Sequence, residues 1–393
     1  MREAVIISAA RTALGKGIKG TLRNTRPDEL ARCAISAVVS RTPGLKTDQV
    51  DDVIIGCAMP EGPQGMNVAR IASLRAGLPV SVPALTINRF CGSGLQSIAF
   101  AVNQIQSGGA DIVIAGGTES MSLVPLGGNN FSPNPYLVDS YPDVYLNMGL
   151  TAENLGKKYS ISRDDQDLFA YQSHQKSIKA IKKNKFKDEI IPFEIPVKGI
   201  NPNGETYSLK SIFEIDECPR NDTSVDTLKR LLPVFDKKGT VTAGNAAQLS
   251  DGAAAVVVTS KEKAIEQEWT ILGRFVSFAT VGVKPEEMGI GPVAAIPKVL
   301  SVAGLDKSSI GLIELNEAFA VQALAVMNEL NLDPNKINVN GGAISLGHPL
   351  GCTGTRLTIT LLHEMKKRNI QFGLVTMCVG GGMGVAAVFE KLS

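Results

Sequence analysis

The fold and chemistry of the chain are read most directly from the stretch Asn88-Arg89-Phe90-Cys91-Gly92-Ser93-Gly94-Leu95-Gln96. A strand-like run ends here, a cysteine stands at the turn, and a helix-length segment begins. A thiolate at a helix N-terminus is stabilised by free backbone N–H groups and by the helix dipole. Gly92 and Gly94 leave room for a substrate to approach the sulfur. Cys91 is therefore a candidate nucleophile, with a small buried core cysteine as the alternative.

Strand-like runs alternate with helix-length amphipathic segments on both sides of this stretch, which favours a layered α/β fold. The expected strands are 4–8, 53–56, 84–88, 112–115, 253–258, 310–315, 336–340 and 372–377. The expected helices are 28–40, 92–105, 318–330 and 353–367.

The two ends of the chain share one order of features: a strand, a glycine-rich turn, a long helix, a strand and a second glycine-rich turn. The first copy runs from 85–88 to 116–117, and the second from 337–340 to 380–382. This order predicts a duplicated domain, although two α/β units can look alike by chance.

The region between the copies is polar, rich in Asn and Pro at first and then rich in Lys. It reads as an insertion into the first copy, because the apolar run 253–258 resumes as a buried strand. The predicted domains are 1–119 for the first part of the N-terminal half, 120–248 for the insert, 249–270 for the completion of that half, and 271–393 for the C-terminal half.

The composition excludes several classes of protein. A net charge of +2 over 393 residues gives no basic field for nucleic acid or an anionic membrane. No apolar run approaches the roughly 20 residues of a membrane span, and the N-terminus leaves no room for a signal peptide. The cytoplasm is therefore the expected location, with six reduced cysteines.

A nucleophile needs a base, and the chain has only three histidines. His174 lies in a polar helical segment and is expected on its solvated face. His363 is expected to be partly buried in the middle of a helix. His348 lies in the glycine-rich loop 341–351, where a side chain can be aimed at a ligand. By elimination it is the candidate base, with a structural role as the alternative.

A second cysteine, Cys378, ends a strand and precedes Gly380-Gly381-Gly382, whose N–H groups could stabilise an oxyanion. We expect Cys378 to stand at the place in the second half that matches Cys91 in the first. A zinc site is disfavoured, because no closely spaced pair of ligands is present. Neither glycine-rich run fits a phosphate-binding loop.

Four separate stretches resemble the thiolase family, and they occur in the family's order. They are 88–94, Asn316-Glu317-Ala318-Phe319-Ala320, 340–351 with its Gly-His-Pro, and 378–384. The resemblance implies two similar βαβαβαββ halves in a five-layered α/β/α/β/α core, with a loop domain inserted in the first half. It also implies cleavage of a 3-ketoacyl-CoA by CoA, or the reverse condensation. Coenzyme A is then a substrate, and no metal or other cofactor is expected.

The resemblance also implies roles for individual residues. Cys91 would attack the 3-keto carbonyl while His348 accepts its proton, and Cys378 would protonate the released enolate. CoA thiolate, generated with His348, would then release the shortened acyl-CoA. One oxyanion site would use His348 and a water held by Asn316, and the other the backbone N–H groups of Cys91 and Gly380.

The family's coenzyme A contacts carry over to positions in and around the insert. They are Met148, Arg220, Phe235, Ala243, Ala247, Leu249, Ala318 and Phe319. Ala247 departs from the family, where many members have Ser, which puts one contact to the pantetheine in doubt.

Within the family, the segments 88–91, 246–251 and 371–373 look like bacterial degradative 3-ketoacyl-CoA thiolases. Acetoacetyl-CoA thiolase is the alternative. Cys378 argues against a carrier-dependent ketoacyl synthase, which lacks a second cysteine acid. The complete set of four candidate residues argues against an inactive lipid-binding relative. The family further implies a homodimer or homotetramer, and some degradative members join a hydratase–dehydrogenase partner.

Overall fold

The computed structural model describes residues 2–200, 203 and 206–392. Its main sheet has the strand order β11-β12-β13-β10-β1-β9-β5-β3-β4, and β1 and β10 meet antiparallel at its centre. The strands of the first half are β1 (Ala4–Thr12), β3 (Asp52–Gly56), β4 (Ala84–Ile87), β5 (Ile112–Ser120) and β9 (Ser250–Ser260). Those of the second half are β10 (Gly273–Gly282), β11 (Ile310–Leu315), β12 (Phe372–Val379) and β13 (Met383–Glu390).

The two halves of the sheet repeat one pattern outward from the centre. In the first half β1 pairs antiparallel with β9, β9 antiparallel with β5, and β5 parallel with β3. In the second half β10 pairs antiparallel with β13, β13 antiparallel with β12, and β12 parallel with β11. The observed topology therefore has the internal repeat that the order of sequence features predicts.

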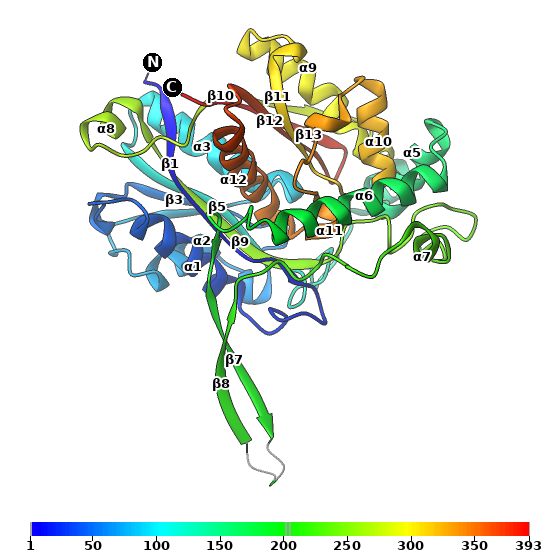
Figure 1. Cartoon of the computed structure of the whole chain (residues 1–393), viewed down its shortest axis with the longest axis horizontal. Coiled ribbons are helices and arrows are strands. Elements are labelled where there is room, and N and C mark those ends of the chain that lie inside the picture. Colours follow the sequence, from blue (N-terminus) through cyan, green and yellow to red (C-terminus); the bar gives the residue numbers. More distant parts are fainter. Residues whose placement is uncertain (1, 201–202, 204–205, 393) are drawn as a thin grey trace.

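Helices separate the halves into layers, and Figure 1 shows α12 running across the middle of the molecule. The helices that form these layers are α1 (Pro27–Ser40), α2 (Val68–Arg75), α3 (Ser93–Ser107), α9 (Gly291–Ala303), α10 (Ala320–Glu329) and α12 (Leu350–Arg368). Helices α1 and α2 cover the outer face of the first half, and α9 and α10 the outer face of the second. Helices α3 and α12 pack between the two halves.

The hydrophobic core follows these layers because side chains alternate along a strand. In β1, Val5 and Ile7 point into the core beneath α1, whereas Ala4 and Ile6 point into the central core around α3 and α12. A third core lies beneath α9 and α10. Three cores between five layers confirm the predicted α/β/α/β/α architecture.

One predicted strand is wrong. Residues 336–340 form only an isolated bridge at Ile337, after the 3-10 turn Pro334–Lys336. Asn338 has a left-handed backbone with φ 44°, which ends any extended run. Its side chain instead bonds both backbone groups of Leu315 at the end of β11, at 2.9 and 2.8 Å. An asparagine side chain thus takes the place of strand pairing.

The region predicted as an insert contains four helices and a hairpin among its described residues. The helices are α4 (Pro135–Ser140), α5 (Met148–Lys158), α6 (Arg163–Lys182) and α7 (Val225–Lys229). The strands are β6 (Ile190–Ile191), β7 (Phe193–Ile200) and β8 (Thr206–Phe213). Figure 1 shows the β7–β8 hairpin extending away from the body of the molecule.

A buried ion-pair cluster ties this region to the core. Arg11, at the end of β1, bonds Glu189 at 3.0 Å and Asp216 at 2.8 Å, and all three side chains are buried. Removing one partner would leave a buried charge unpaired. The cluster therefore fixes both ends of the segment that carries the hairpin.

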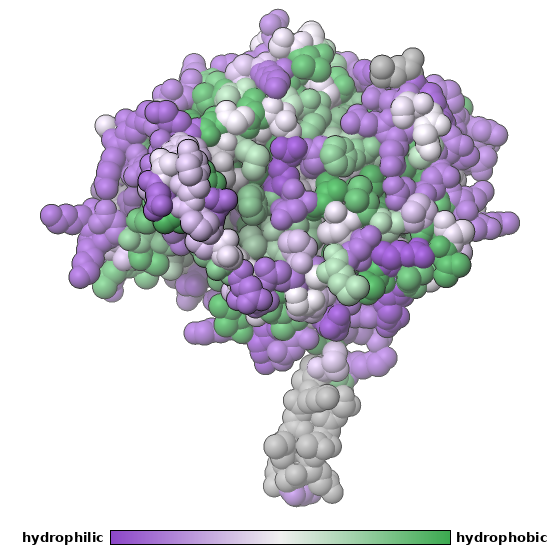
Figure 2. Space-filling view, turned by 180° about the vertical axis from the view of Figure 1, so that it is seen from behind, coloured by the Kyte–Doolittle hydropathy of each residue, from purple (hydrophilic) through white to green (hydrophobic). Residues whose placement is uncertain are grey.

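The remaining elements are short. They are β2 (Gly15–Lys16), α8 (Lys261–Glu266), α11 (Ala343–Leu346) and several 3-10 turns. None of the helices in the described part of the chain is long and apolar enough to cross a lipid bilayer. The face opposite to that of Figure 1 mixes hydrophobic and hydrophilic residues (Figure 2).

Candidate active site

Cys91 lies in the 3-10 turn Phe90–Gly92, immediately before α3. The turn is held in an unusual shape, because Phe90 has φ 43°. Asn88 Oδ1 accepts the Phe90 N–H at 2.8 Å, and Ser93 Oγ donates to the Phe90 carbonyl at 2.6 Å. A left-handed backbone at a bulky residue persists only where its surroundings impose it. The turn leaves Cys91 partly exposed at the start of the helix.

The surroundings of Cys91 have two opposing effects on the pKa of its thiol. Its own backbone N–H and that of Gly380 are directed at the sulfur and favour the thiolate. Burial is the larger effect and raises the pKa of Cys91 to about 11. Cys91 is therefore a neutral thiol at pH 7, and it needs a base to become a nucleophile. The same two N–H groups are oriented to hold an oxyanion that forms at this position.

His348 is buried between two polar partners. Its Nδ1 lies 2.6 Å from Thr353 Oγ1, and Thr353 Oγ1 lies 2.8 Å from the Pro349 carbonyl. The single hydroxyl proton of Thr353 goes to that carbonyl, which assigns the ring proton to Nδ1. Nε2 is then an acceptor, 3.3 Å from Asn316 Nδ2.

The charge state of His348 suits a base. Burial, with a smaller effect from the positive charge of Arg356, lowers the pKa of His348 to about 3. The imidazole is therefore neutral at physiological pH, with its lone pair on Nε2.

The candidate residues of the second half gather around the Cys91 turn. Asn316 follows β11 and donates its backbone N–H to the Thr376 carbonyl on β12 at 3.0 Å. Cys378 is buried near the end of β12, and burial together with nearby Cys91 raises the pKa of its thiol. The Cys91 turn contacts both β12 and α12, and Cys91 packs against a small cluster formed by Ala58, Met121 and Leu350.

The expected match between Cys378 and Cys91 is wrong. In the register of the sheet Cys378 is paired with Gly384, the second residue of β13. Counted outward from the central pair Val5 and Arg274, the corresponding pair in the first half is Thr118 and Ala253, since β5 and β9 occupy the places of β12 and β13. The counterpart of Cys378 is therefore Thr118, a buried residue near the end of β5 and next to Glu119.

Two buried carboxylates that support the site were missed from sequence. Glu119 accepts hydrogen bonds from the segment before the Cys91 strand and from the start of α12. Glu317, next to Asn316, accepts from Ser173, Asn338 and Ile344 and so braces the His348 loop. The available signal was an acidic residue immediately after an apolar strand, where an unpaired charge would be costly.

The expectations for the other two histidines meet different outcomes. His174 is buried, not on a solvated face, and its Nδ1 accepts the backbone N–H of Arg220 at 3.2 Å. Burial lowers the pKa of His174 to about 4. A polar helical segment favours a solvated face, but α6 packs against α7, α10 and α11. His363 is half-buried in α12, as predicted.

Most of the candidate coenzyme A contacts form one connected surface beside the site. The segment 243–249 is paired with the segment after Asn316: Ala247 N–H donates to the Ala318 carbonyl at 2.9 Å, and Ala246 bridges Phe319. The Gln248 carbonyl accepts the His348 backbone N–H at 3.2 Å. Ala243 and Leu249 are exposed at either end of the segment.

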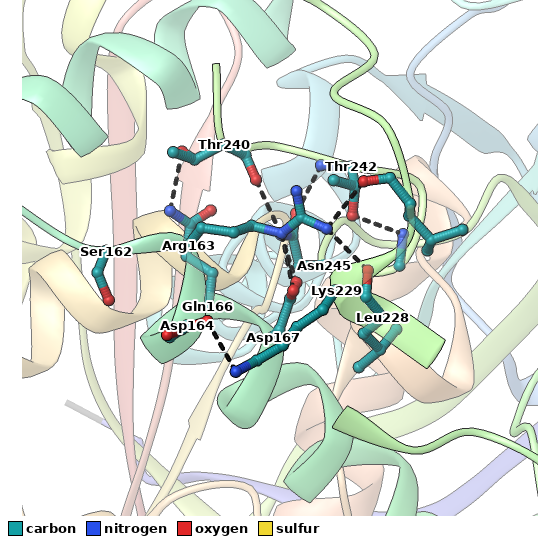
Figure 3. A network of polar contacts seen from close by, with 12 residues as sticks. Ser162, Arg163, Asp164, Gln166, Asp167, Leu228, Lys229, Thr240, Thr242 and Asn245 are labelled. Atoms are coloured by element: carbon teal, nitrogen blue, oxygen red, sulfur yellow. Dashed lines mark hydrogen bonds and ion pairs between the residues drawn. The ribbon is translucent and has the colours of Figure 1, made fainter. Parts of the chain in front are cut away.

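A polar network fastens this segment to α6 (Figure 3). Asn245 Nδ2 donates to Asp167 and to the Thr240 carbonyl, both at 3.0 Å. Arg163 pairs with Asp167 at 2.7 Å and donates to the Leu228 carbonyl at 2.7 Å. The segment next to His348 is thus held by side chains from a helix of the insert.

The remaining candidates lie around the same surface. Phe235 packs edge-on against Phe319, with ring centroids 6.3 Å apart. Met148 begins α5, and its sulfur lies 3.7 Å from where a Cβ on Gly380 would be. Arg220 is exposed, two residues beyond Cys218, whose carbonyl accepts from Gln248 Nε2 at 3.1 Å.

Comparisons with known proteins cover the whole chain. The family models described as "Thiolase, N-terminal domain" and "Thiolase, C-terminal domain" match residues 4–262 and 269–391. A 3-ketoacyl-CoA thiolase of Bacillus subtilis is 54% identical over 390 residues, covering 99% of this chain and 100% of the relative. An acetyl-CoA acetyltransferase of Cupriavidus necator is 46% identical, with 100% of both chains covered.

Solved structures agree with this sequence relationship. Human mitochondrial 3-ketoacyl-CoA thiolase superposes with a TM-score of 0.89 at 39% identity, covering 100% of this chain and 99% of the other. Bacillus anthracis acetyl-CoA acetyltransferase superposes with a TM-score of 0.90 at 41% identity and the same coverage. The chain has the thiolase fold and belongs to the thiolase family of acyltransferases.

Proposed function

We propose that this protein is a 3-ketoacyl-CoA thiolase, which uses CoA to cleave a 3-ketoacyl-CoA into acetyl-CoA and an acyl-CoA two carbons shorter. The substrate assignment follows the 54% identity to the Bacillus subtilis 3-ketoacyl-CoA thiolase. Oxidative degradation of fatty acids would produce such a substrate.

In the first stage Cys91 attacks the 3-keto carbon and gives its proton to His348 Nε2. The oxyanion is held by the N–H groups of Cys91 and Gly380, which are directed at the Cys91 sulfur. The bond between C2 and C3 then breaks and leaves an acyl thioester on Cys91. The enolate of acetyl-CoA, held by His348 and Asn316, takes a proton from Cys378.

In the second stage CoA attacks the acyl thioester. The first stage leaves one proton on His348 and none on Cys378, so the pair can take the CoA proton. When the tetrahedral adduct collapses, Cys91 leaves and receives a proton from the same pair. All three side chains thus return to their starting states, and the shortened acyl-CoA is released.

The observation that carries this proposal is the pairing of a neutral thiol with a neutral imidazole. The Thr353 hydroxyl assigns the proton to Nδ1 of His348 and leaves the lone pair of Nε2, which faces Asn316 Nδ2, to accept the thiol proton. Two backbone N–H groups directed at the Cys91 sulfur then favour the oxyanion formed there. Removing one such donor commonly costs about 10²–10³ in rate.

The test is steady-state thiolysis of 3-ketoacyl-CoAs from four to sixteen carbons. We expect turnover over a range of chain lengths, with loss of activity in Cys91→Ala and retention in Cys33→Ala, which removes a thiol in the core beneath α1. Full activity in Cys91→Ala would overturn the mechanism. Activity confined to carrier-protein substrates would overturn the family role.

Acetoacetyl-CoA thiolase is the second candidate. It is favoured by acetyl-CoA acetyltransferases that are 44–46% identical over nearly the whole chain. A sharp preference for the four-carbon substrate in the same assay would select this alternative.

We place coenzyme A on the surface formed by the segment 243–249, Ala318, Phe319 and Phe235, with Met148 and Arg220 at its margins. The support is that this surface is continuous with the His348 loop. Ala247 offers a methyl group where many family members have a hydroxyl. Ala247→Ser is therefore expected to lower the KM for CoA without raising kcat, and an unchanged KM would remove this contact.

The proposed setting of the enzyme is the cytoplasm, as a homodimer or homotetramer, with a hydratase–dehydrogenase as a possible partner. The support is the relationship to bacterial thiolases. We also retain the domain boundaries 1–119, 120–248, 249–270 and 271–393 as a proposal. Size-exclusion chromatography with light scattering tests the oligomeric state.

A further inference from the structure

We propose that Glu119 is a positioning residue that holds the Cys91 turn and the His348 loop at their working separation. This inference rests on the proposed function of the two residues as nucleophile and base. The Glu119 side chain is buried and accepts four hydrogen bonds from nitrogen donors, two on each carboxylate oxygen. These donors come from two parts of the chain that lead separately to Cys91 and His348.

The first connection runs to the nucleophile. Glu119 accepts the backbone N–H groups of Ala58 at 2.7 Å and Met59 at 3.2 Å. The Ala58 carbonyl accepts from Asn88 Nδ2 at 3.0 Å, and Asn88 Oδ1 accepts the N–H of Phe90 at 2.8 Å. Phe90 is the left-handed residue that precedes Cys91. The carboxylate is therefore linked through three hydrogen bonds to the turn that aims the thiol.

The second connection runs to the base. The Glu119 oxygen that binds Ala58 also accepts the N–H of Gly351 at 2.8 Å. Gly351 is the second residue of α12, three residues beyond His348, and Thr353 in the same turn holds His348 Nδ1. A carboxylate at a helix N-terminus is also favoured by the helix dipole. One oxygen atom thus bridges the nucleophile side and the base side of the site.

The backbone around this bridge is closely packed. A Cβ on Gly351 would lie 2.7 Å from the Gly56 carbonyl, and a Cβ on Gly94 would lie 2.6 Å from the Gly351 carbonyl. The starts of α3 and α12 therefore touch through glycine backbone. Because the helices cannot approach more closely, the hydrogen bonds of Glu119 can fix their separation.

Glu119 acts through other groups, since its hydrogen-bond donors are structural. Gln64 Nε2 supplies the fourth bond at 2.5 Å, and Gln64 Oε1 accepts the Ser120 N–H at 2.9 Å. Burial is the larger effect and raises the pKa of Glu119, while the hydrogen bonds from its four donors act in the opposite direction. In the second half the end of the corresponding strand carries Cys378, the proposed acid. The inference is that one half uses this strand end for chemistry and the other uses it to hold the site together.

The test compares Glu119→Gln with Asp251→Asn in thiolysis assays. An amide has one acceptor oxygen, so at least two of the four donors lose their partner in Glu119→Gln. Displacing a reacting group by about 1 Å can cost about 10² in rate. We therefore expect kcat to fall about 10²-fold, with KM for both substrates changed less than about threefold. This split separates positioning of reacting groups from loss of substrate binding.

Asp251→Asn is the matched control for stability. Asp251 is also a buried carboxylate, and it accepts from Ser120 and Ser122, close to Glu119 in the chain. It is expected to lower Tm as Glu119→Gln does while keeping kcat within about twofold. Equal losses of kcat in both variants would overturn the proposal, as would a Glu119→Gln enzyme with wild-type kcat or with a change confined to KM.

Asn88→Ala tests the nucleophile connection alone and keeps the proposal testable if Glu119→Gln does not fold. It leaves every bond of Glu119 in place but cuts the link to Phe90. We expect kcat to fall about tenfold, and an unchanged kcat would overturn the proposal. Wild-type protein that does not cleave 3-ketoacyl-CoAs would instead overturn the proposed function, a result that is independent of these variants.

Discussion

The ends of β5 and β12 occupy equivalent places in the two halves of the sheet but carry different chemistry. Near the end of β5 lies Glu119, with four hydrogen-bond donors around its carboxylate. Near the end of β12, at the position that matches Thr118 in the register, lies Cys378, a buried thiol close to Cys91. The difference shows how a duplicated fold divides its work between holding a site and acting in it.

A second pair of equivalent places follows the same logic. Cys91 lies between β4 and α3, and His348 lies between the Ile337 bridge and α12, each just before the helix that packs in the central layer. The candidate nucleophile and base therefore come from matching loops. Because α3 and α12 touch at their N-termini, the repeat brings these loops together.

The largest loss of activity is expected for Cys91→Ala. The variant removes the atom that would carry the acyl group, and no other cysteine in the site lies at the start of α3. We expect thiolysis to fall by at least about 10⁴-fold, because loss of a nucleophile removes the covalent path. The measurement is steady-state turnover, with mass spectrometry of the protein after incubation with acetyl-CoA. Acylation of the variant at another residue would contradict the assignment.

Cys378→Ser tests the proposed acid near the end of β12. A hydroxyl is a far weaker acid than a thiol, so protonation of the enolate should slow. We expect thiolysis to fall about 10²–10⁴-fold, the usual range for losing a general acid. Transfer of an acetyl group from acetyl-CoA to Cys91 forms no enolate and needs no proton delivered to carbon. Its rate should therefore fall less than about tenfold. Equal losses in both assays would mean that Cys378 supports the fold around Cys91 instead.

Thr353→Val removes the hydrogen-bond partner of His348 Nδ1 and leaves His348 itself unchanged. Valine has a similar shape but cannot accept the Nδ1 proton, so the neutral imidazole can place its proton on Nε2 instead. We expect kcat to fall about 10- to 100-fold with a smaller change in KM. Thr358→Val, which removes a buried hydroxyl further along α12, is the control. Similar losses in both variants would assign the effect to the helix and not to the tautomer.

The sequence was most informative where a motif and a strand end coincide. The Cys91 turn, the His348 loop and the order of the repeat could all be predicted, because glycines and apolar runs mark such turns directly. The place of Cys378 in the repeat, which matches Thr118, could not be predicted, since it depends on strand register. His174 was also misjudged, because a polar helix gives no sign that it will be covered by other helices.

The smallest expected effect concerns stability, and here the candidate nucleophile and base should act in opposite pH ranges. The pKa of His348 is lowered from 6.5 to about 3 in the folded protein. Below pH 6.5 the unfolded chain therefore binds a proton that the folded chain refuses, and stability is lost as pH falls. The pKa of Cys91 is raised from 9.0 to about 11. Above pH 9 the unfolded chain releases a proton that the folded chain keeps, and stability is lost as pH rises.

Urea unfolding of wild type, His348→Gln and Cys91→Ala at several pH values separates these two contributions. His348→Gln should flatten the dependence of the unfolding free energy on pH between 4 and 6, by up to about 1.4 kcal/mol per pH unit. Cys91→Ala should flatten it only between pH 9 and 11, and by less, because the thiol is partly exposed. The remaining buried groups, His174 among them, are common to all three proteins and cancel. Parallel curves for His348→Gln and wild type below pH 6 would mean that His348 is charged in the folded protein, and the neutral base would have to be abandoned.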